Sequence, residues 1–232
     1  MDLAELTWTE AGERAEGGAL LAVPLGATEQ HGPHLPLSTD TDVAAELCRR
    51  LAAARGDVLV APPLGYGASG EHAGFAGTLS LGTEVLTALL VELGRSAGES
   101  FTRMLLVNAH GGNAEAVRDA VRTLRAESRD VLAWSPRRSG DAHAGASETS
   151  LQLALAPARV RTHRVRPGAT APLAELMPAL RAGGVRAVSA GGVLGDPTGA
   201  TSAEGERLLA SLTRDLLAAV ARWAGPVDRD DV

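Results

Sequence analysis

Short apolar runs alternate along this chain with longer segments that carry apolar residues at helical spacing. The runs are rich in Val, Leu and Ala, as expected for strands covered on both faces. Four of them are ALLAVPL (19–25), DVLVAPPL (57–64), RMLLVNA (103–109) and DVLAWSP (130–136). The segments with helical spacing lie at 40–55, 82–98, 113–128, 147–156 and 202–224. This alternation predicts an α/β fold, a three-layer α/β/α sandwich with a mostly parallel sheet.

The chain contains no internal repeat, low-complexity block or linker that would divide it. Its 232 residues suit one sizeable core, so we expect a single domain over 1–232. Segment 158–200 is rich in Gly and Pro and has no clear periodicity, so it predicts no element. Residues 226–232 read as a frayed acidic tail.

Composition and charge exclude several classes of function. A net charge of -6 and the absence of any dominant basic patch argue against a nucleic-acid partner. The chain has no lysine, which excludes a catalytic or P-loop lysine. Its single cysteine, Cys48, excludes an internal disulfide and a cysteine-based zinc site, and reads as a buried hydrophobe. The acidic N-terminus and the lack of a run of about 20 apolar residues predict a cytoplasmic protein outside the membrane.

Polar clusters follow each predicted strand. They are TEQHGPHLPLSTDTD (28–42), YGASGEH (66–72), NAHGGN (108–113) and DAHAGASETS (141–150). If the strands are parallel, all four loops meet at the carboxyl edge of the sheet, where open α/β folds bind ligands. Five of the six histidines fall in these loops: His31, His34, His72, His110 and His143.

The side chains in these loops suit metal coordination. Glu29 and His31 are separated by one residue, so in extended backbone they point the same way. Each other candidate also has an ordinary role: Asp40 as a helix N-cap, His110 as a satisfied core histidine, and Glu148 as a stabilising carboxylate at a helix start. Together the five predict two divalent ions bridged by Asp40, with zinc, iron(II) and manganese all acceptable. Paired ions commonly generate a hydroxide nucleophile and polarise a carbonyl, so we expect a hydrolytic site.

The four loops together resemble the creatininase family of metal-dependent amidohydrolases. The resemblance runs through LGATEQHGPHLPLSTDT, GASGEHAGFAGTLSLGT, NAHGGN and DAHAGASETS in order, and weakly through GGVLGDPTGATSAEGE (191–206). It implies a creatininase-like fold, a two-metal centre, hydrolysis of a non-standard C–N amide bond, and rings of identical subunits such as hexamers. The residues that match family ligands are Glu29, His31, Asp40 as the bridge, and His110.

This sequence departs from the creatinine-cleaving members at one ligand. Those members carry a glutamate two residues after the NxH histidine, where this chain has Gly112. Glu148 is the family alternative, and the change speaks against creatinine as substrate. Ala109 also replaces a usual glycine. The segments YGASGEHAGFAGTLSLGT, LVELGRSAG and GDAHAGASETS are most similar to the branch of peptidases of mycofactocin maturation. That branch implies release of the modified C-terminal Val-Tyr unit of a precursor peptide.

The remaining loop residues have predicted roles around the ions. His143 is either the general acid for the departing amine or a hydrogen-bonding partner that orients Glu148 or a water. Glu71 and His72 face the substrate, or form an ordinary loop ion pair. His34 and Asp42 are expected behind the ligands. The loop is shaped by three further residues, Gly32, Pro33 and Pro36.

Substrate contacts are predicted from the same loops. Backbone N–H groups at a helix start suit developing negative charge, which points to Gly111, Gly112 and Asn113. The few aromatic residues nearby, Tyr66, Phe75 and Trp134, are expected to form an apolar wall for the substrate. Ser69 is expected to provide a polar contact.

Two other functions stay open at this level. The first is hydrolysis of another small amide, such as creatinine, a formamide or a cyclic amide. The second is a non-catalytic metal- or anion-binding module, because the turn GGN could hold a phosphate. The chain has no GxGxxG or GxxxxGK[ST] pattern, so nothing further supports a nucleotide.

Overall fold

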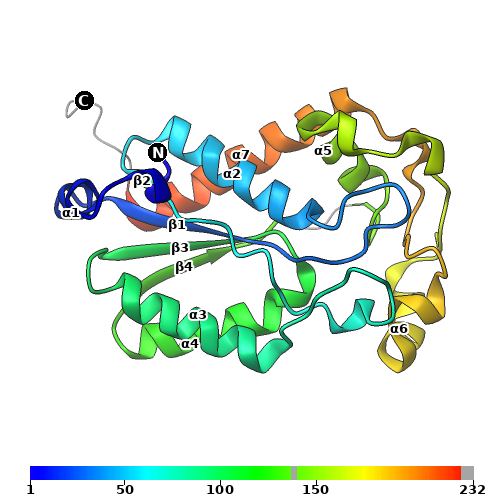
Figure 1. Ribbon diagram of the computed structural model, residues 1–232, viewed down its shortest axis with the longest axis horizontal. Coiled ribbons are helices and arrows are strands. Elements are labelled where there is room, and N and C mark those ends of the chain that lie inside the picture. The colour runs from blue at the N-terminus through cyan, green and yellow to red at the C-terminus, as the bar shows by residue number, and fades with distance from the viewer. Residues whose placement is uncertain (137–139, 226–232) are drawn as a thin grey trace.

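The computed structural model describes residues 1–136 and 140–225 and contains one four-stranded sheet (Figure 1). All strands are parallel, in the order β2-β1-β3-β4: β1 (Leu20–Leu25), β2 (Val58–Val60), β3 (Arg103–Asn108) and β4 (Asp130–Trp134). Each strand falls within a predicted run. Strand β2 is shorter than predicted, and Pro62 and Pro63 follow it; proline has no N–H for a sheet ladder. The tail predicted at 226–232 lies outside the described residues.

Helices cover both faces of the sheet, which confirms the three-layer architecture. Figure 1 shows α3 (Thr83–Ala97) and α4 (Ala114–Ala126) on one face, and α2 (Thr39–Ala54) and α7 (Ser202–Ala224) on the other. Helix α5 (Ala146–Leu155) packs against α7. The pleat of β1 separates two apolar cores. Leu21 and Val23 pack toward α3 and α4, whereas Leu20 and Ala22 pack toward α2 and α7.

Two helices were not predicted, α1 (Trp8–Glu16) and α6 (Leu173–Val188). Helix α6 contains Pro178 and is broken at Gly184, whose φ of 67° is outside the helical region. Both features interrupt the apolar periodicity from which a helix is predicted. Short 3-10 turns complete the described chain: η1 (Leu3–Glu5), η2 (Gly70–His72), η3 (Gly111–Asn113), η4 (Pro157–Arg159), η5 (Thr162–Arg164) and η6 (Pro197–Gly199).

The strand order creates a switch point beside β1. The chain leaves β1 toward β2 on one side and later returns to β3 on the other. Loops that follow β1 and β3 therefore separate at the carboxyl edge and leave room for a ligand between them. Among the described helices, none combines the length and the hydropathy needed to cross a membrane.

Candidate metal centre

Four separate parts of the chain bring the five predicted ligands to this switch point. Glu29 and His31 lie in the loop after β1, and His110 lies in the loop after β3; all three are buried. Asp40 is in the first turn of α2, and Glu148 is in the first turn of α5. The N-cap role considered for Asp40 is wrong, because Ser38 occupies that position.

The five side chains form two triads that share Asp40. In the first triad, His31 Nε2 lies 3.4 Å from Asp40 Oδ1 and 3.8 Å from Glu148 Oε2. In the second triad, His110 Nδ1 lies 3.2 Å from Asp40 Oδ2, and His110 Nε2 lies 3.2 Å from Glu29 Oε2. Within each triad, one potential ligand atom per residue lies within 4.8 Å of the others.

Each triad histidine has one ring nitrogen beside a backbone carbonyl and the other beside Asp40. His31 Nδ1 lies 3.2 Å from the carbonyl oxygen of Glu29, and His110 Nε2 lies 3.0 Å from that of Ala68. A carbonyl only accepts, so these nitrogens carry the protons. The lone pairs of His31 Nε2 and His110 Nδ1 therefore face Asp40, the arrangement typical of metal-ligating histidines.

Several buried acceptors at this centre have no hydrogen-bond partner. They are both carboxylate oxygens of Glu29, Oδ2 of Asp40 and Nε2 of His31. Burying lone pairs and negative charge without hydrogen bonds costs several kcal/mol, which the facing histidines offset only in part and a bound cation would remove. The residues therefore fit divalent ions well.

The electrostatics of the protein without metal show how strongly these groups interact. Burial, followed by the nearby Asp40 carboxylate, raises the pKa of Glu29 to about 7. Burial alone would lower the histidine pKa values, but the carboxylates outweigh it: Asp40, Glu148 and Glu29 raise the pKa of His31 to about 10, and Asp40 and Glu29 raise that of His110 to about 9. Protons thus compete with metal ions for the same lone pairs.

A second set of polar residues orients Glu29. The Gln30 amide donates to His72 Nδ1 at 2.8 Å and to the Gly192 carbonyl at 3.1 Å. His72 Nε2 then carries a proton and faces Glu29 Oε1 at 3.3 Å. His143 Nε2 donates to the Gln30 carbonyl at 2.7 Å, so its Nδ1 lone pair faces Glu29 Oε1 at 3.8 Å. Glu29, His31 and His143 make a third group with metal-ligand spacing.

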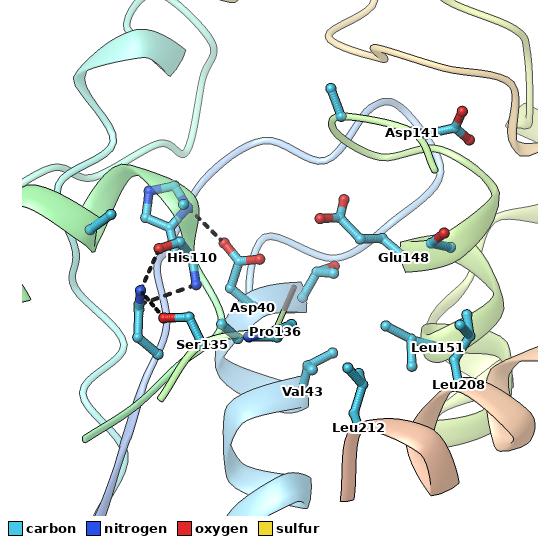
Figure 2. Close-up of a pocket in the computed structure, with 17 residues that line it drawn as sticks. Asp40, Val43, His110, Ser135, Pro136, Asp141, Glu148, Leu151, Leu208 and Leu212 are labelled. Atoms are coloured by element: carbon cyan, nitrogen blue, oxygen red, sulfur yellow. Dashed lines mark hydrogen bonds and ion pairs between the residues drawn. The ribbon is translucent and has the colours of Figure 1, made fainter. Parts of the chain in front are cut away.

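Glu148 is oriented by the loop before its helix. The backbone N–H of Ala144 donates to Glu148 Oε2 at 2.6 Å, and Ala144 has a left-handed φ of 51°. Asp141 accepts the N–H of Ala146 at 2.6 Å, which holds the first turn of α5. Figure 2 shows Asp40 and Glu148 on opposite sides of the space between α2 and α5. The unusual backbone at Ala144 thus supports a site residue.

Two cavities lie on either side of His110 and share His110, Gly111 and Ala142. The first, which we name the α7 cavity, measures about 360 Å³ and has Asp40, Glu148 and Asp141 at its rim. Its floor is aliphatic (Figure 2) and consists of Val43, Leu151, Leu208 and Leu212. The second, the α6 cavity, measures about 720 Å³ and is lined by Glu71, His72, His143, Leu173, Met177 and Arg181.

The other predicted site residues divide into two groups. Gly111 lines both cavities, and Gly112, Glu71, His72 and His143 line the α6 cavity. Ser69 is buried with its hydroxyl 3.4 Å from His110 Nε2. His34 is buried as predicted behind the ligands, where Nε2 lies 2.9 Å from the Thr149 hydroxyl.

The predicted aromatic wall is not assembled. Trp134 is buried in the α2–α7 core with its N–H donated to Asp215, and Tyr66 is 56% exposed. Neither residue lines the two cavities, and Phe75 does not either. Asn113 lines neither cavity: its N–H donates to the His110 carbonyl, and its side chain accepts from Ala68 N and donates to the Gly26 carbonyl.

Sequence reasoning missed Gln30 and Ala144. Gln30 stands between two candidate ligands, and in extended backbone its side chain would point away from theirs; that alternation was the available signal. The role of Ala144 depends on a backbone conformation that no side-chain pattern indicates.

The comparison with known families agrees with this geometry. The creatininase family model, described as creatinine amidohydrolase, matches residues 4–220. The chain belongs to the creatininase family. It is therefore a hydrolase of C–N amide bonds.

Several creatininase-family relatives are similar over most of this chain. A mycofactocin precursor peptide peptidase of Mycobacterium ulcerans is 54% identical over 217 residues, covering 89% of this chain and 86% of that protein. The creatinine amidohydrolase of Pseudomonas putida is 34% identical, covering 75% and 80%. A crystal structure of creatinine amidohydrolase has a TM-score of 0.82 at 30% identity, covering 97% and 98% of the chains. Solved creatininase structures include a manganese form and a Zn-Zn form.

Proposed function

We propose that this chain is a dinuclear metal-dependent peptidase that cleaves an amide bond of the mycofactocin precursor peptide and releases its modified C-terminal Val-Tyr unit. The observation that carries the proposal is the pair of carboxylate–imidazole triads that share Asp40. The substrate assignment is supported by relatives named mycofactocin precursor peptide peptidase, which are 54% identical over most of both chains. We further propose that the protein works in the cytoplasm as a ring of identical subunits.

One ion would be held by each triad. His31, Asp40 and Glu148 would hold the first, and Glu29, Asp40 and His110 the second. When bound, such ions polarise an amide carbonyl and activate a water molecule. Imidazole and carboxylate ligands accept zinc, iron(II) or manganese, and these three metals are our candidates.

Glu71 is the residue that we assign to proton transfer. Its Oε1 lies 3.8 Å from His110 Nε2, and its side chain remains 39% exposed beside the α6 cavity. Hydrolysis breaks the C–N bond, adds the water oxygen with one hydrogen to the acyl carbon, and moves the other hydrogen to the departing nitrogen. A carboxylate next to the reacting bond can accept that hydrogen and donate it to the nitrogen.

His143 is assigned a positioning role instead of the general acid role. Its N–H is directed at the Gln30 carbonyl, and its other ring nitrogen faces Glu29. It therefore helps to fix the main chain between Glu29 and His31. Gly111 lies between the cavities, where its backbone N–H suits the negative charge that develops on the amide oxygen.

Creatinine is a poor candidate substrate because of Gly112. A Cβ at this position would lie 2.3 Å from the Ala68 carbonyl oxygen and 2.5 Å from Glu71 Oε1. A glutamate ligand therefore has no room there, and Glu148 supplies a carboxylate to the first triad from another helix.

The decisive experiment combines a metal count with a cleavage assay. Purified protein loaded with zinc, iron(II) or manganese is incubated with modified precursor peptide, and the released C-terminal unit is identified by mass spectrometry. Asp40→Ala should lose both ions and all turnover, because both triads lose a ligand. Asp42→Ala, two residues further along α2, is the control, since its carboxylate binds Arg159 and Gln152.

Two outcomes would contradict the proposal. Full activity of Asp40→Ala with unchanged metal content would refute the ligand assignment. Bound metal without cleavage of any precursor peptide or small amide would favour a non-catalytic metal-binding module. Cleavage of creatinine, a formamide or a cyclic amide in place of the peptide would keep the amidohydrolase and change its substrate. Sedimentation analysis tests the ring assembly separately.

A further inference from the structure

The α7 cavity has a floor that metal binding does not explain. Val43 of α2 and Leu151 of α5 are buried, and Leu208 and Leu212 of α7 are partly buried beneath the carboxylates (Figure 2). An ion in the first triad needs polar ligands only. An aliphatic surface next to such a centre favours a ligand whose apolar groups cover it, because this removes apolar surface from water.

The α6 cavity on the other side of His110 has a different character. One face of α6 borders it with Leu173, Met177, Leu180 and Arg181, at the spacing of residues on one side of a helix. Leu173 is 42% exposed, so this border reaches the solvent. Polar groups from Glu71, His72 and His143 stand opposite. Such a mixed and larger space suits an extended peptide that continues into solvent.

We propose that the substrate peptide lies across both cavities in one direction. The apolar side chains of the departing C-terminal unit bind in the α7 cavity. The chain that precedes the cleaved bond leaves through the α6 cavity, and the cleaved bond itself lies over Gly111, which both cavities share. This inference rests on the proposed peptidase function and adds the orientation of its substrate and the residues that select it.

Size and shape decide the direction. The α7 cavity is half as large as the other, at about 360 against 720 Å³, and its floor consists of the buried Val43 and Leu151 and the partly buried Leu208 and Leu212. This smaller space suits a short terminal piece better than a long stretch of chain. Its volume is at the lower end of the range for small-ligand sites, which matches a unit with one aliphatic and one aromatic side chain. The longer part of the precursor needs the space that opens past α6.

The test changes the floor without touching a ligand. Leu212→Phe reduces the α7 cavity, and Leu212→Ala enlarges it. Three precursor peptides that differ only in the last residue, Tyr, Val or Ala, are compared by kcat/KM. Leu212→Phe should lower kcat/KM for the Tyr peptide by about 10- to 100-fold and spare the Ala peptide, because a misfitted apolar group costs about 1–3 kcal/mol. Leu212→Ala should reduce the preference for the large residue.

The matched control is Leu217→Phe. Leu217 is also a partly buried leucine of α7 in the same core but does not line the cavity. It should leave the ratio of the three kcat/KM values unchanged, and metal content should match the wild type in all variants. An equal loss for all three peptides with Leu212→Phe would mean a merely structural effect and overturn the proposal. Altered C-terminal preference with Met177→Glu instead would reverse the direction of the peptide.

Binding of a Val-Tyr dipeptide separates this inference from the proposed function. Calorimetry on metal-loaded protein should detect dipeptide binding to the wild type and at least about tenfold weaker binding to Leu212→Phe. That result supports the cavity assignment even if no precursor peptide is cleaved. If the wild type cleaves the precursor but Leu212→Phe binds the dipeptide as tightly as the wild type does, the peptidase function would stand. The assignment of the C-terminal unit to the α7 cavity would then be refuted.

Discussion

Replacing Gly112 by alanine tests how closely the loop after β3 is fitted around His110. The added Cβ would lie 2.3 Å from the Ala68 carbonyl oxygen, 2.4 Å from His110 Nε2 and 2.5 Å from Glu71 Oε1. Ordinary contacts need about 3.5 Å, so at least one of these groups must move by about 1 Å. The Ala68 carbonyl accepts the proton of His110 Nε2, and any such shift disturbs the bond that orients this ligand.

The expected cost of Gly112→Ala has two parts. Overpacking a partly buried, closely fitted position such as Gly112 lowers the free energy of unfolding by about 1–3 kcal/mol. A misplacement of 1 Å at a reacting centre costs about 10²-fold in rate. We therefore expect kcat to fall about 100-fold and metal content to fall in the second triad, which contains His110. Urea unfolding, elemental analysis and peptide-cleavage kinetics measure the three quantities.

Gly70→Ala is the matched control for this variant. Gly70 stands in the facing turn η2, and a Cβ there meets nothing within 4 Å. Its metal content and kcat should stay within about twofold of wild type, as for a substitution without packing consequences. If Gly112→Ala also keeps full metal content and kcat, then the loop after β3 can move to accommodate the added Cβ without loss of function. The hydrogen bond from His110 to Ala68 would then not be needed for activity.

Three further results follow from the same geometry. Glu71→Gln should lower kcat by about 10²–10⁴-fold with unchanged metal content, as expected for a proton carrier; a change confined to KM would contradict that role. Glu148→Gln should reduce metal content by about one ion per subunit in elemental analysis, since only the first triad contains it; loss of both ions would contradict separate triads. Between about pH 7 and 9, metal affinity should rise by about tenfold per pH unit for each ion, because binding displaces one proton each from His31 and His110, whose pKa values are raised to about 10 and 9. Below about pH 7 the rise should be steeper for the second triad, since the pKa of Glu29 is raised to about 7. A chelator competition that shows no pH dependence would refute this.

The strand pattern and the convergence of the candidate ligands could be predicted from the sequence because both follow local rules. Apolar runs predict buried strands, and side chains that follow parallel strands converge at one edge of the sheet. Glu29, His31 and His110 illustrate this, since each lies in a loop directly after a buried strand. Asp40 and Glu148 join them because each opens a helix whose start faces the same edge.

The substrate side could not be predicted in the same way. The aromatic wall is not formed because Trp134 packs in the core between the sheet and α7, where its N–H donates to Asp215. Which core the end of a strand faces depends on how the helices pack, and the sequence pattern does not show it. Helix α6 was missed because Pro178 and Gly184 interrupt its pattern. The floor of the α7 cavity comes from helices far apart in the chain, so its composition depends on how they pack.

The first triad is joined to the end of the chain through one close helix crossing. Gly205 of α7 passes so near to α5 that a Cβ there would lie 1.9 Å from the Ser150 carbonyl oxygen, two residues beyond Glu148. Any side chain at position 205 would push α7 away from the helix that carries Glu148. A substitution on α7, which contributes no residue to either triad, can therefore disturb the first triad through helix packing alone.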